Sequence, residues 1–210
     1  MTEETGQRVR SGYHHGGLRE ALLLAAEQEL IEKGIEGFTL RGVAKRAGVS
    51  HAAPAHHFRD TSDLLTALAA VAATRFRDTM KQRQAKSPGD ARSQFIASGQ
   101  GYIEFALDNP ALFGLMFGSR RPDFSSEEFS RPSFESFMVL VKDVADLRGD
   151  NALDHVEGRA DILTAWSLVH GLANLLIAGR LRFLEADLKA DRDGTILRAL
   201  ERVVPGDRRG

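Results

Sequence analysis

The sequence predicts an all-α protein of about nine helices, because helix signals fill the chain and strand signals do not. Apolar residues recur every three or four positions through most of it, which is the spacing of one helix face. No alternating run of Val, Ile or Thr between turn residues indicates a strand. The 210 residues are 42% hydrophobic and 27% charged, which is typical of a globular chain and excludes the disordered and collagen-like classes.

Three helices are expected in the N-terminal part of the chain, at 18–33, 40–47 and 50–57. The first carries an apolar stripe that includes Leu18 and Leu22. Gly34 follows this helix, at a place where a helix C-terminus favours a left-handed residue. Thr39 and Ser50 are of the types that cap helix N-termini, so we expect each to open the helix that follows it.

The rest of the chain predicts longer helices with clear breaks between them. Asp60, Thr61 or Ser62 caps a long helix, and Ser87-Pro88-Gly89 ends it. The expected helices lie at 61–86, 90–107, 111–117, 134–147 (or from before Pro132), 153–181 and 192–204. We therefore expect two domains, an N-terminal three-helix domain at 1–60 and a C-terminal helical bundle at 61–210.

The composition excludes several classes of protein. The chain has no cysteine, so disulfides, thiol chemistry and cysteine-ligated zinc sites are excluded. Adjacent histidines on a helix point about 100° apart, and no His-Glu-x-x-His pattern occurs, so we expect neither a metal nor a cofactor. Nucleophile motifs and phosphate-binding glycine loops are also missing from the sequence, so we do not expect an enzyme.

The sequence is expected to give a soluble, cytoplasmic protein. The start, Met1-Thr-Glu-Glu-Thr-Gly, has no apolar core of a signal peptide. The uncharged run between Asp161 and Arg180 is long enough for a membrane span, but it contains Thr, Ser, His and Asn side chains. We interpret it as a helix that is buried on most sides.

Charge is distributed in blocks along the first sixty residues. Three Arg and no acid lie in 8–19, five Glu and one Lys in 20–36, and four basic residues with no acid in 37–59. Five of the seven histidines lie in the two basic blocks. This pattern favours a surface that meets an anion such as a phosphate backbone, although a solvated helix face gives similar grouping.

Residues 39–58, TLRGVAKRAGVSHAAPAHHF, combine a helix, a glycine turn and a second helix. Ala44 is small enough for the second helix to cross closely, Gly48 permits a tight turn, and Val49 fills the angle between the helices. This is the spacing of a helix-turn-helix, whose second helix enters the major groove of DNA. A tight helix pair without that function would give a similar pattern.

Taken with GYHHGGLR at 12–19, FTLR at 38–41 and His57-Phe58, this stretch resembles the DNA-binding domain of the TetR family of bacterial regulators. The resemblance covers about residues 13–68. Farther on, LDNPALF at 107–113, Met116-Phe117 and Trp166-x-x-x-His170-Gly171 resemble the WHG-type C-terminal domain of that family. The resemblance implies an all-α homodimer whose N-terminal helices bind DNA and whose C-terminal helices hold a small-molecule pocket and the dimer interface.

The resemblance also implies which residues meet double-stranded DNA. Candidate groove or phosphate contacts are Ser50, His51, Ala52, His56 and His57, and candidate backbone contacts are Thr39, Arg41, Lys45, Arg46 and Thr61, with Arg8 and Arg10 as an N-terminal arm. Ala55 stands where the family usually has Tyr, and Thr61 stands where Lys is common. Both usual residues approach phosphates, so their loss is expected to weaken the sequence-independent part of DNA binding.

A ligand pocket is expected in the C-terminal part, because eight of the twelve Phe lie between 95 and 137. Aromatic rings and Met side chains line adaptable apolar pockets, although they also fill cores. Candidate ligand residues are Tyr102, Phe105, Phe113, Met116, Phe117, Phe134, Phe137, Met138, Trp166, His170 and Asn174. They predict a mostly apolar effector.

The last two long helices match those that form a four-helix dimer interface in the family. Its apolar contacts are expected from Leu168, Leu172, Leu175, Leu176, Ile196, Leu200 and Val203. The sequence therefore predicts a ligand-responsive transcriptional regulator, a repressor that binds a palindromic operator as a homodimer. The alternative is a sensor or interaction protein of this family that has lost sequence-specific DNA binding, and activation instead of repression also stays open.

Overall fold

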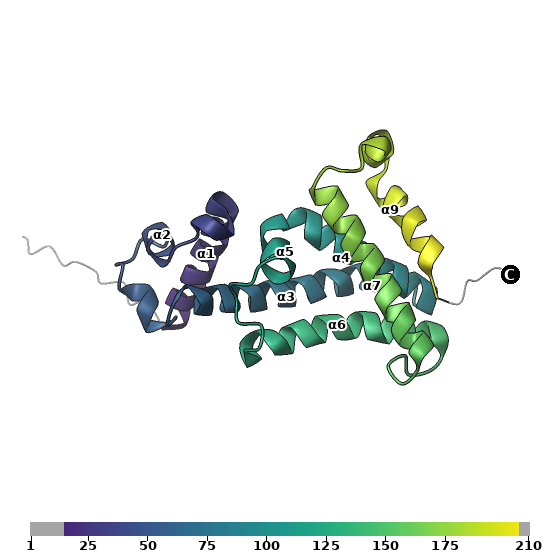
Figure 1. Ribbon diagram of the computed structural model, residues 1–210, viewed down its shortest axis with the longest axis horizontal. Helices are drawn as coiled ribbons and strands as arrows, with labels where there is room; N and C mark the ends of the chain where they lie inside the picture. The colour runs from purple at the N-terminus through teal and green to yellow at the C-terminus, as the bar shows by residue number, and fades with distance from the viewer. Residues whose placement is uncertain (1–14, 206–210) are drawn as a thin grey trace, which may run out of the picture. The chain divides into compact units, whose positions relative to one another are not determined.

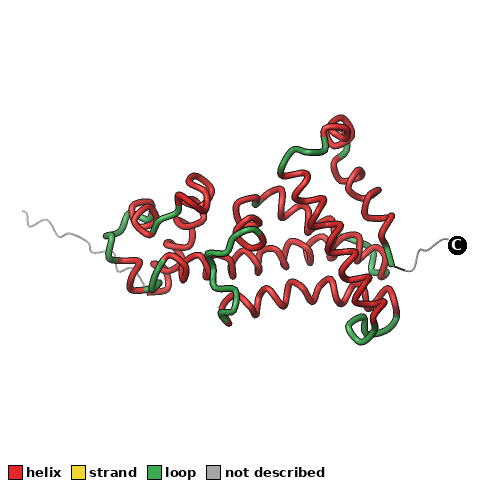
Figure 2. The backbone as a smooth tube through the Cα atoms, in the orientation of Figure 1, coloured by secondary structure: helices red, strands yellow, loops and turns green. Residues whose placement is uncertain are grey.

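A computed structural model of the protein describes residues 15–205, and all regular structure within that range is helical (Figures 1 and 2). This confirms the all-α fold. The α-helices are α1 (His15–Gly37), α2 (Leu40–Arg46), α3 (Thr61–Ala85), α4 (Ala91–Asp108), α5 (Pro110–Phe117), α6 (Glu127–Arg148), α7 (Val156–Ile177), α8 (Glu185–Ala190) and α9 (Arg192–Leu200). Three short 3₁₀ helices join them, at Ala53–His56, Arg182–Leu184 and Glu201–Val203.

The chain forms two compact units that divide between Leu64 and Leu65, inside α3. The first unit contains α1, α2 and the 3₁₀ helix at 53–56. Its core is made of side chains from α1 and α2 that are almost fully buried, including Leu22, Ala26 and Val43. Leu22 and Ala26 are four residues apart, so they lie on one face of α1 and give it the apolar stripe that packs inward.

The second unit is built around α4, which packs against α5, α6, α7 and α9. Phe105 and Ile103 of this helix are completely buried. Gly101 allows α3 to approach α4 at backbone distance, because a Cβ on Gly101 would lie only 2.7 Å from the Met80 Cα. Helix α4 begins beside the predicted start at 90, where the Asp90 carboxylate caps it by accepting a 2.9 Å hydrogen bond from the Ser93 amide.

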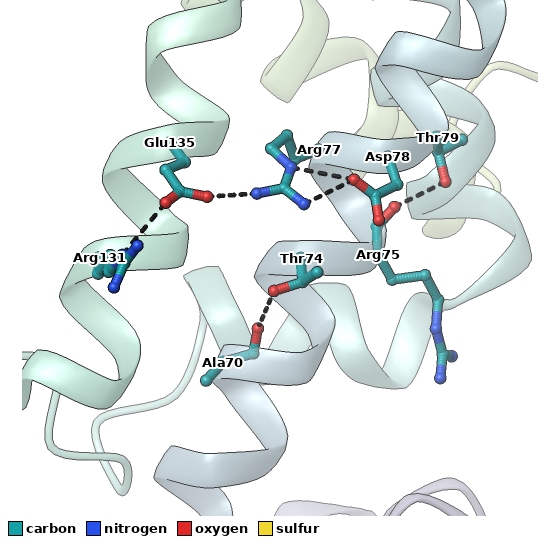
Figure 3. A network of polar contacts seen from close by, with 8 residues as sticks. All are labelled: Ala70, Thr74, Arg75, Arg77, Asp78, Thr79, Arg131 and Glu135. Carbon is teal, nitrogen blue, oxygen red and sulfur yellow. Dashed lines mark hydrogen bonds and ion pairs between the residues drawn. The ribbon is translucent and has the colours of Figure 1, made fainter.

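Ion pairs join α3 to α6 on the outside of this unit (Figure 3). The Arg77 guanidinium contacts Glu135 of α6 and also donates from Nε to Asp78 Oδ1 at 3.0 Å. The same Glu135 accepts a hydrogen bond from Arg131 Nε at 3.3 Å. One carboxylate of α6 is therefore shared between an arginine of its own helix and an arginine of α3.

The segment at 50–57 differs from the α-helix expected there. Ser50 opens no α-helix, and residues 53–56 instead form a 3₁₀ helix closed by i→i−3 bonds such as Ala55 N to the Ala52 carbonyl at 3.2 Å. The cause is Pro54, which has no N–H to give to the carbonyl four residues earlier. The tighter 3₁₀ turn avoids that missing bond.

Other boundaries differ for local reasons. Helix α6 begins at Glu127, so the earlier of the two predicted starts is right, and Pro132 is accommodated in its second turn. Helix α7 ends before 181 because Gly179 adopts a φ of 62°, and the Arg180 amide then donates back to the Leu175 carbonyl at 2.9 Å. Helix α8 was not predicted.

Candidate functional site

The helix-turn-helix of the first unit is held by local bonds at both ends of α2. The Thr39 hydroxyl oxygen accepts a 3.0 Å hydrogen bond from the Gly42 amide and so caps the helix. At the other end, Gly48 adopts a φ of 69°, a conformation that favours glycine. The Val49 amide then donates to the Ala44 carbonyl at 3.0 Å, which closes the turn. The chain leaves α2 in a fixed direction as a result.

The segment after that turn presents polar side chains to solvent. Ser50, His51, Ala52 and His56 are exposed, and His57 is half-buried. Pro54 and Phe58 are buried, so they attach the segment to the rest of the first unit. The Arg19 guanidinium lies over the Phe58 ring at 5.3 Å, a cation–π contact that ties α1 to the anchor. The exposed residues thus lie on a short ridge, residues 50–57, that is attached through its buried side chains.

The predicted phosphate-binding cations of α2 have different surroundings. Arg41 and Lys45 are exposed, whereas Arg46 forms ion pairs with Glu29, at 3.1 Å, and with Glu32. Glu29 is only 5% exposed, so Arg46 also neutralises a buried carboxylate. These contacts hold the pKa of the Glu32 carboxyl below its ordinary value. Arg46 therefore joins α2 to α1.

The remaining predicted DNA-contact residues lie at the edges of the unit. Thr61 is half-buried in the first turn of α3, where Asp60 caps the helix by accepting from the Asp63 amide at 2.9 Å. Arg8 and Arg10 lie outside the described residues.

The second unit encloses an apolar cavity of about 250 Å³. Residues from α3, α4, α5, α6 and α7 line it, together with Phe124 of the loop before α6 and Leu200 of α9. The lining residues are Phe76, Met80, Phe95, Ser98, Gly99, Tyr102, Met116, Phe117, Phe124, Phe129, Ser133, Ser136, Phe137, Leu140, Ala165, Trp166, Val169 and Leu200. Many of them are aromatic, which suits a flat or apolar molecule.

Tyr102 connects the cavity wall to His170 of α7. The Tyr102 hydroxyl lies 2.8 Å from His170 Nδ1. Burial lowers the pKa of His170 and raises the pKa of Tyr102, so both side chains are neutral near pH 7. The phenol donates to Nδ1 in the tautomer of His170 that carries its ring proton on Nε2. Phe76 packs edge-on against the same Tyr102 ring at 4.8 Å.

A buried carboxyl lies behind the cavity wall at Ser98. Asp143 of α6 is 3% exposed, and its two oxygens contact Ser98 Oγ at 2.5 Å and Gln84 Nε2 at 2.8 Å. Burial raises the pKa of this carboxyl from 3.8 to about 6, and the two hydrogen bonds oppose that rise only in part. Ser98 Oγ also lies 2.9 Å from the Phe95 carbonyl. The Ser98 hydroxyl donates to the Asp143 carboxylate when that group is ionised, and it donates to the Phe95 carbonyl when Asp143 is protonated and itself donates to Ser98.

The candidate ligand residues separate into lining and non-lining groups. The lining group is Tyr102, Met116, Phe117, Phe137 and Trp166. Phe105 and Phe113 are instead buried in the core, and Phe134 points to solvent with 61% of its surface exposed. Met138, His170 and Asn174 do not line the cavity either, and the Asn174 amide donates to the His170 carbonyl at 2.9 Å.

The contribution of α3 to the cavity was not expected from the sequence. Phe76 and Met80 are four residues apart on that helix, so they share a face. Their spacing was visible in the sequence, but they lie before the Phe-rich region. Ser133 and Ser136 were missed because nothing in the sequence shows that they face a cavity.

The predicted dimer residues have two different environments. Ile196 and Leu200 are 5% and 1% exposed within one protomer, so their side chains pack in the core of the second unit. Leu175 is exposed, while Leu168, Leu172 and Leu176 are half-buried. The side chain of Val203 lies outside the described part of the chain.

Helix α7 exposes several apolar side chains. Leu163, Leu175 and Ile177 are between 39% and 64% exposed, and no atom lies within 4 Å of the position a Cβ would take on Gly171. Of the helices described, α7 is the one that is long and apolar enough to cross a membrane. Within its most apolar stretch of 18 residues, 22% is buried inside the structure. A core helix of a soluble protein passes the same test, so this is weak support for a span.

Comparison with known proteins places the chain among bacterial regulators that carry a helix-turn-helix. A sequence model described as "Tetracyclin repressor-like, C-terminal domain" matches residues 95–202, and one described as "Bacterial regulatory proteins, tetR family" matches residues 22–68. The first spans just over half of the chain. The chain therefore belongs to the TetR family, whose members regulate transcription and are not enzymes.

Solved structures share the fold of this chain. A Rhodococcus sp. RHA1 structure of a protein with unknown function is 32% identical, covers 90% of this chain and 97% of its own, and has a TM-score of 0.72. A putative transcriptional regulator from Pseudomonas aeruginosa PAO1, with 19% identity, a TM-score of 0.67 and coverage of 96% and 95%, shares the fold.

One curated relative matches a short part of the chain. The HTH-type transcriptional repressor BepR of Brucella suis biovar 1 (strain 1330) is 44% identical over 50 residues, which are 24% of each chain. The chain thus spans about a quarter of the length of that relative.

Proposed function

We propose that this protein is a cytoplasmic repressor that binds a palindromic operator in double-stranded DNA as a homodimer and is released by a small, mostly apolar effector. The observation that carries the proposal is the closed turn at Gly48, which is followed by the exposed ridge 50–57 and preceded by the exposed cations Arg41 and Lys45 of α2. A ridge of this kind reads base edges, and the cations beside it bind phosphates.

The DNA contacts divide by chemistry. Ser50, His51 and His56 carry exposed donors for base edges, and Ala52 offers a methyl group to thymine. Arg41 and Lys45 bind phosphates, and Thr39 and Thr61 add hydroxyl contacts. Arg46 contributes less charge, because its guanidinium also serves Glu29 and Glu32. His57, half-buried beside Phe58, and the arm at Arg8 and Arg10 complete the proposed surface.

Dimerisation uses the exposed face of α7. Leu168, Leu172, Leu175 and Leu176 give it apolar contacts, and the open space at Gly171 lets the helix of a second copy approach closely. Two protomers related by a twofold axis would present two ridges to one palindrome. A Leu175→Glu substitution should then give monomers by light scattering, whereas Leu153→Glu, at an exposed leucine outside α7, should leave the dimer intact. A dimer that survives Leu175→Glu argues against this face.

Effector binding changes the conformation of the DNA-binding unit through α3. This helix supplies Phe76 and Met80 to the cavity wall, and its first turn, from Thr61, belongs to the N-terminal unit. A molecule in the cavity contacts α3 directly, so it can favour one position of this helix over another. It releases DNA only if it binds the two conformations with different affinity.

The experiment that tests the function is selection of bound sequences from a random pool of DNA duplexes at physiological salt. We expect a palindrome with two half-sites separated by a fixed spacing. His51→Ala should relax base preference at one position in each half-site, while Ser125→Ala, at an exposed serine in the C-terminal unit, should select the original site.

The second candidate function is a sensor without sequence-specific DNA binding. The side chain of Ala55 is exposed on the ridge but has no hydrogen-bonding group, which favours this alternative. Failure of a folded dimer to enrich any sequence would support it and reject the repressor.

A further inference from the structure

The cavity wall carries no formal charge. Among the described residues that line it, there is no Asp, Glu, Lys, Arg or His. An ionised ligand would lose its hydration there without gaining an opposite charge, which is costly in an apolar environment. The ligand is therefore uncharged when it is bound.

The carboxyl nearest the wall does not change that conclusion. Asp143 lies behind Ser98, and both of its oxygens are already hydrogen-bonded, one to Ser98 and one to Gln84. A cationic ligand would find no free carboxylate oxygen. An anionic ligand would meet a like charge whenever Asp143 is ionised.

The volume of the cavity limits the size of the ligand. An apolar cavity of about 150 Å³ holds benzene, so by proportion a cavity of this size holds about ten non-hydrogen atoms. That is one fused pair of aromatic rings or a single substituted ring. The rings of Phe76, Phe137 and Trp166 offer faces and edges to such a molecule.

Ser136 places a hydroxyl in the wall that is available as a hydrogen-bond acceptor. Ser136 of α6 is 6% exposed and lines the cavity, and its hydroxyl proton is donated to the Ser133 carbonyl at 2.7 Å. A hydroxyl has two lone pairs besides its proton, and these remain to accept from a ligand. Ser98 also lines the cavity, but its hydroxyl is engaged in two contacts, with the Asp143 carboxyl and with the Phe95 carbonyl.

We propose that the cavity selects a small, uncharged aromatic molecule that carries one O–H or N–H donor, and that Ser136 accepts the hydrogen bond from that donor. This inference rests on the proposed effector function and specifies the chemistry of the effector. Phenol-like and indole-like molecules belong to the class. Aromatic carboxylates and amines that are charged at neutral pH do not.

The test is calorimetric titration of the full-length protein, without DNA, with four probes that share one ring system. They are β-naphthol, its methyl ether, β-naphthoate and β-naphthylmethylammonium. We expect β-naphthol to bind about tenfold more tightly than its methyl ether, which has lost the donor. We expect the anion and the cation to bind at least about a hundredfold more weakly than β-naphthol.

Two serine variants separate the hydrogen bond from the fit of the methyl group. In Ser136→Ala the preference for β-naphthol over its ether should disappear, because the acceptor is gone. In Ser130→Ala, at an exposed serine on the same helix, the preference should persist. A preference that survives in Ser136→Ala comes from another acceptor in the wall or from steric exclusion of the methyl group, and either cause overturns the role of Ser136.

Two further outcomes of the titration would overturn the proposal. Binding of β-naphthoate or the ammonium probe as tight as that of β-naphthol overturns the claim that the cavity excludes charge. Absence of binding by all four probes to a folded protein overturns the proposal for this cavity. Neither result tests the proposed DNA-binding function, because the selection of DNA sequences uses no ligand.

Discussion

Asp143 makes the stability of this protein depend on pH in a direction opposite to that of most aspartates. Burial raises the pKa of its carboxyl from 3.8 to about 6 in the folded protein. Between those two values the folded state holds a proton that the unfolded state has released, so the free energy of unfolding falls as the pH rises. Above about pH 6 the full cost is present, about 3 kcal/mol at 1.4 kcal/mol for each pKa unit.

Asp143→Asn should remove this cost. The asparagine amide has the shape of the protonated acid, so its oxygen can accept from Gln84 and its nitrogen can donate to Ser98. We expect the variant to be more stable than the natural protein by about 3 kcal/mol at about pH 8 and by only about 1 kcal/mol at about pH 4.5.

Urea denaturation of both proteins at the two pH values measures this difference. Other titrating groups are common to both chains and cancel in the comparison. Asp146→Asn is the matched control, because Asp146 lies three residues away on α6 but is exposed and paired with Lys142. A stability gain that is the same at both pH values, or a loss at the higher one, would refute the reasoning.

Three further predictions concern packing, an ion pair and DNA affinity. Gly101→Ala should lower the free energy of unfolding by about 2 kcal/mol, because the added methyl group lies against the Met80 backbone; an unchanged urea midpoint would show that α3 and α4 can separate freely. Arg46→Ala should lower the thermal midpoint by leaving Glu29 buried without its cation. Adding Glu29→Gln to this variant should recover most of the lost thermal stability. If no stability is recovered, the buried charge of Glu29 is not the cause of the loss. Arg41→Ala should weaken binding to every DNA sequence and reduce the slope of log affinity against log salt by about one; an unaltered slope would exclude a phosphate contact.

Local signals in the sequence were enough to predict most helix ends. Helix α2 lies where Thr39 and Gly48 place it, because a cap and a left-handed glycine act within a few residues of the bond they control. The same reasoning was incomplete at 50–57. Ser50 predicts an α-helix at this place. Pro54 lacks the N–H that would bond to the carbonyl four residues earlier, and a 3₁₀ helix forms instead.

The site was harder to predict, because tertiary packing decides which apolar residues face a cavity. Phe105 and Phe117 look alike in sequence, yet Phe105 fills the core and Phe117 lines the cavity. Leu200 has the helical spacing of an interface residue, but it packs inward and reaches the cavity wall. Periodicity identifies a buried face and does not identify what that face is buried against.

Trp166 gives the cavity its own spectroscopic signal. It is the single tryptophan of the chain, it lines the cavity, and 39% of its surface is exposed. Indole emission shifts to shorter wavelength when water leaves its surroundings, so a ligand that fills the cavity should shift the tryptophan fluorescence of the entire protein. Occupancy can then be followed with optically silent ligands in unlabelled protein, with or without DNA present.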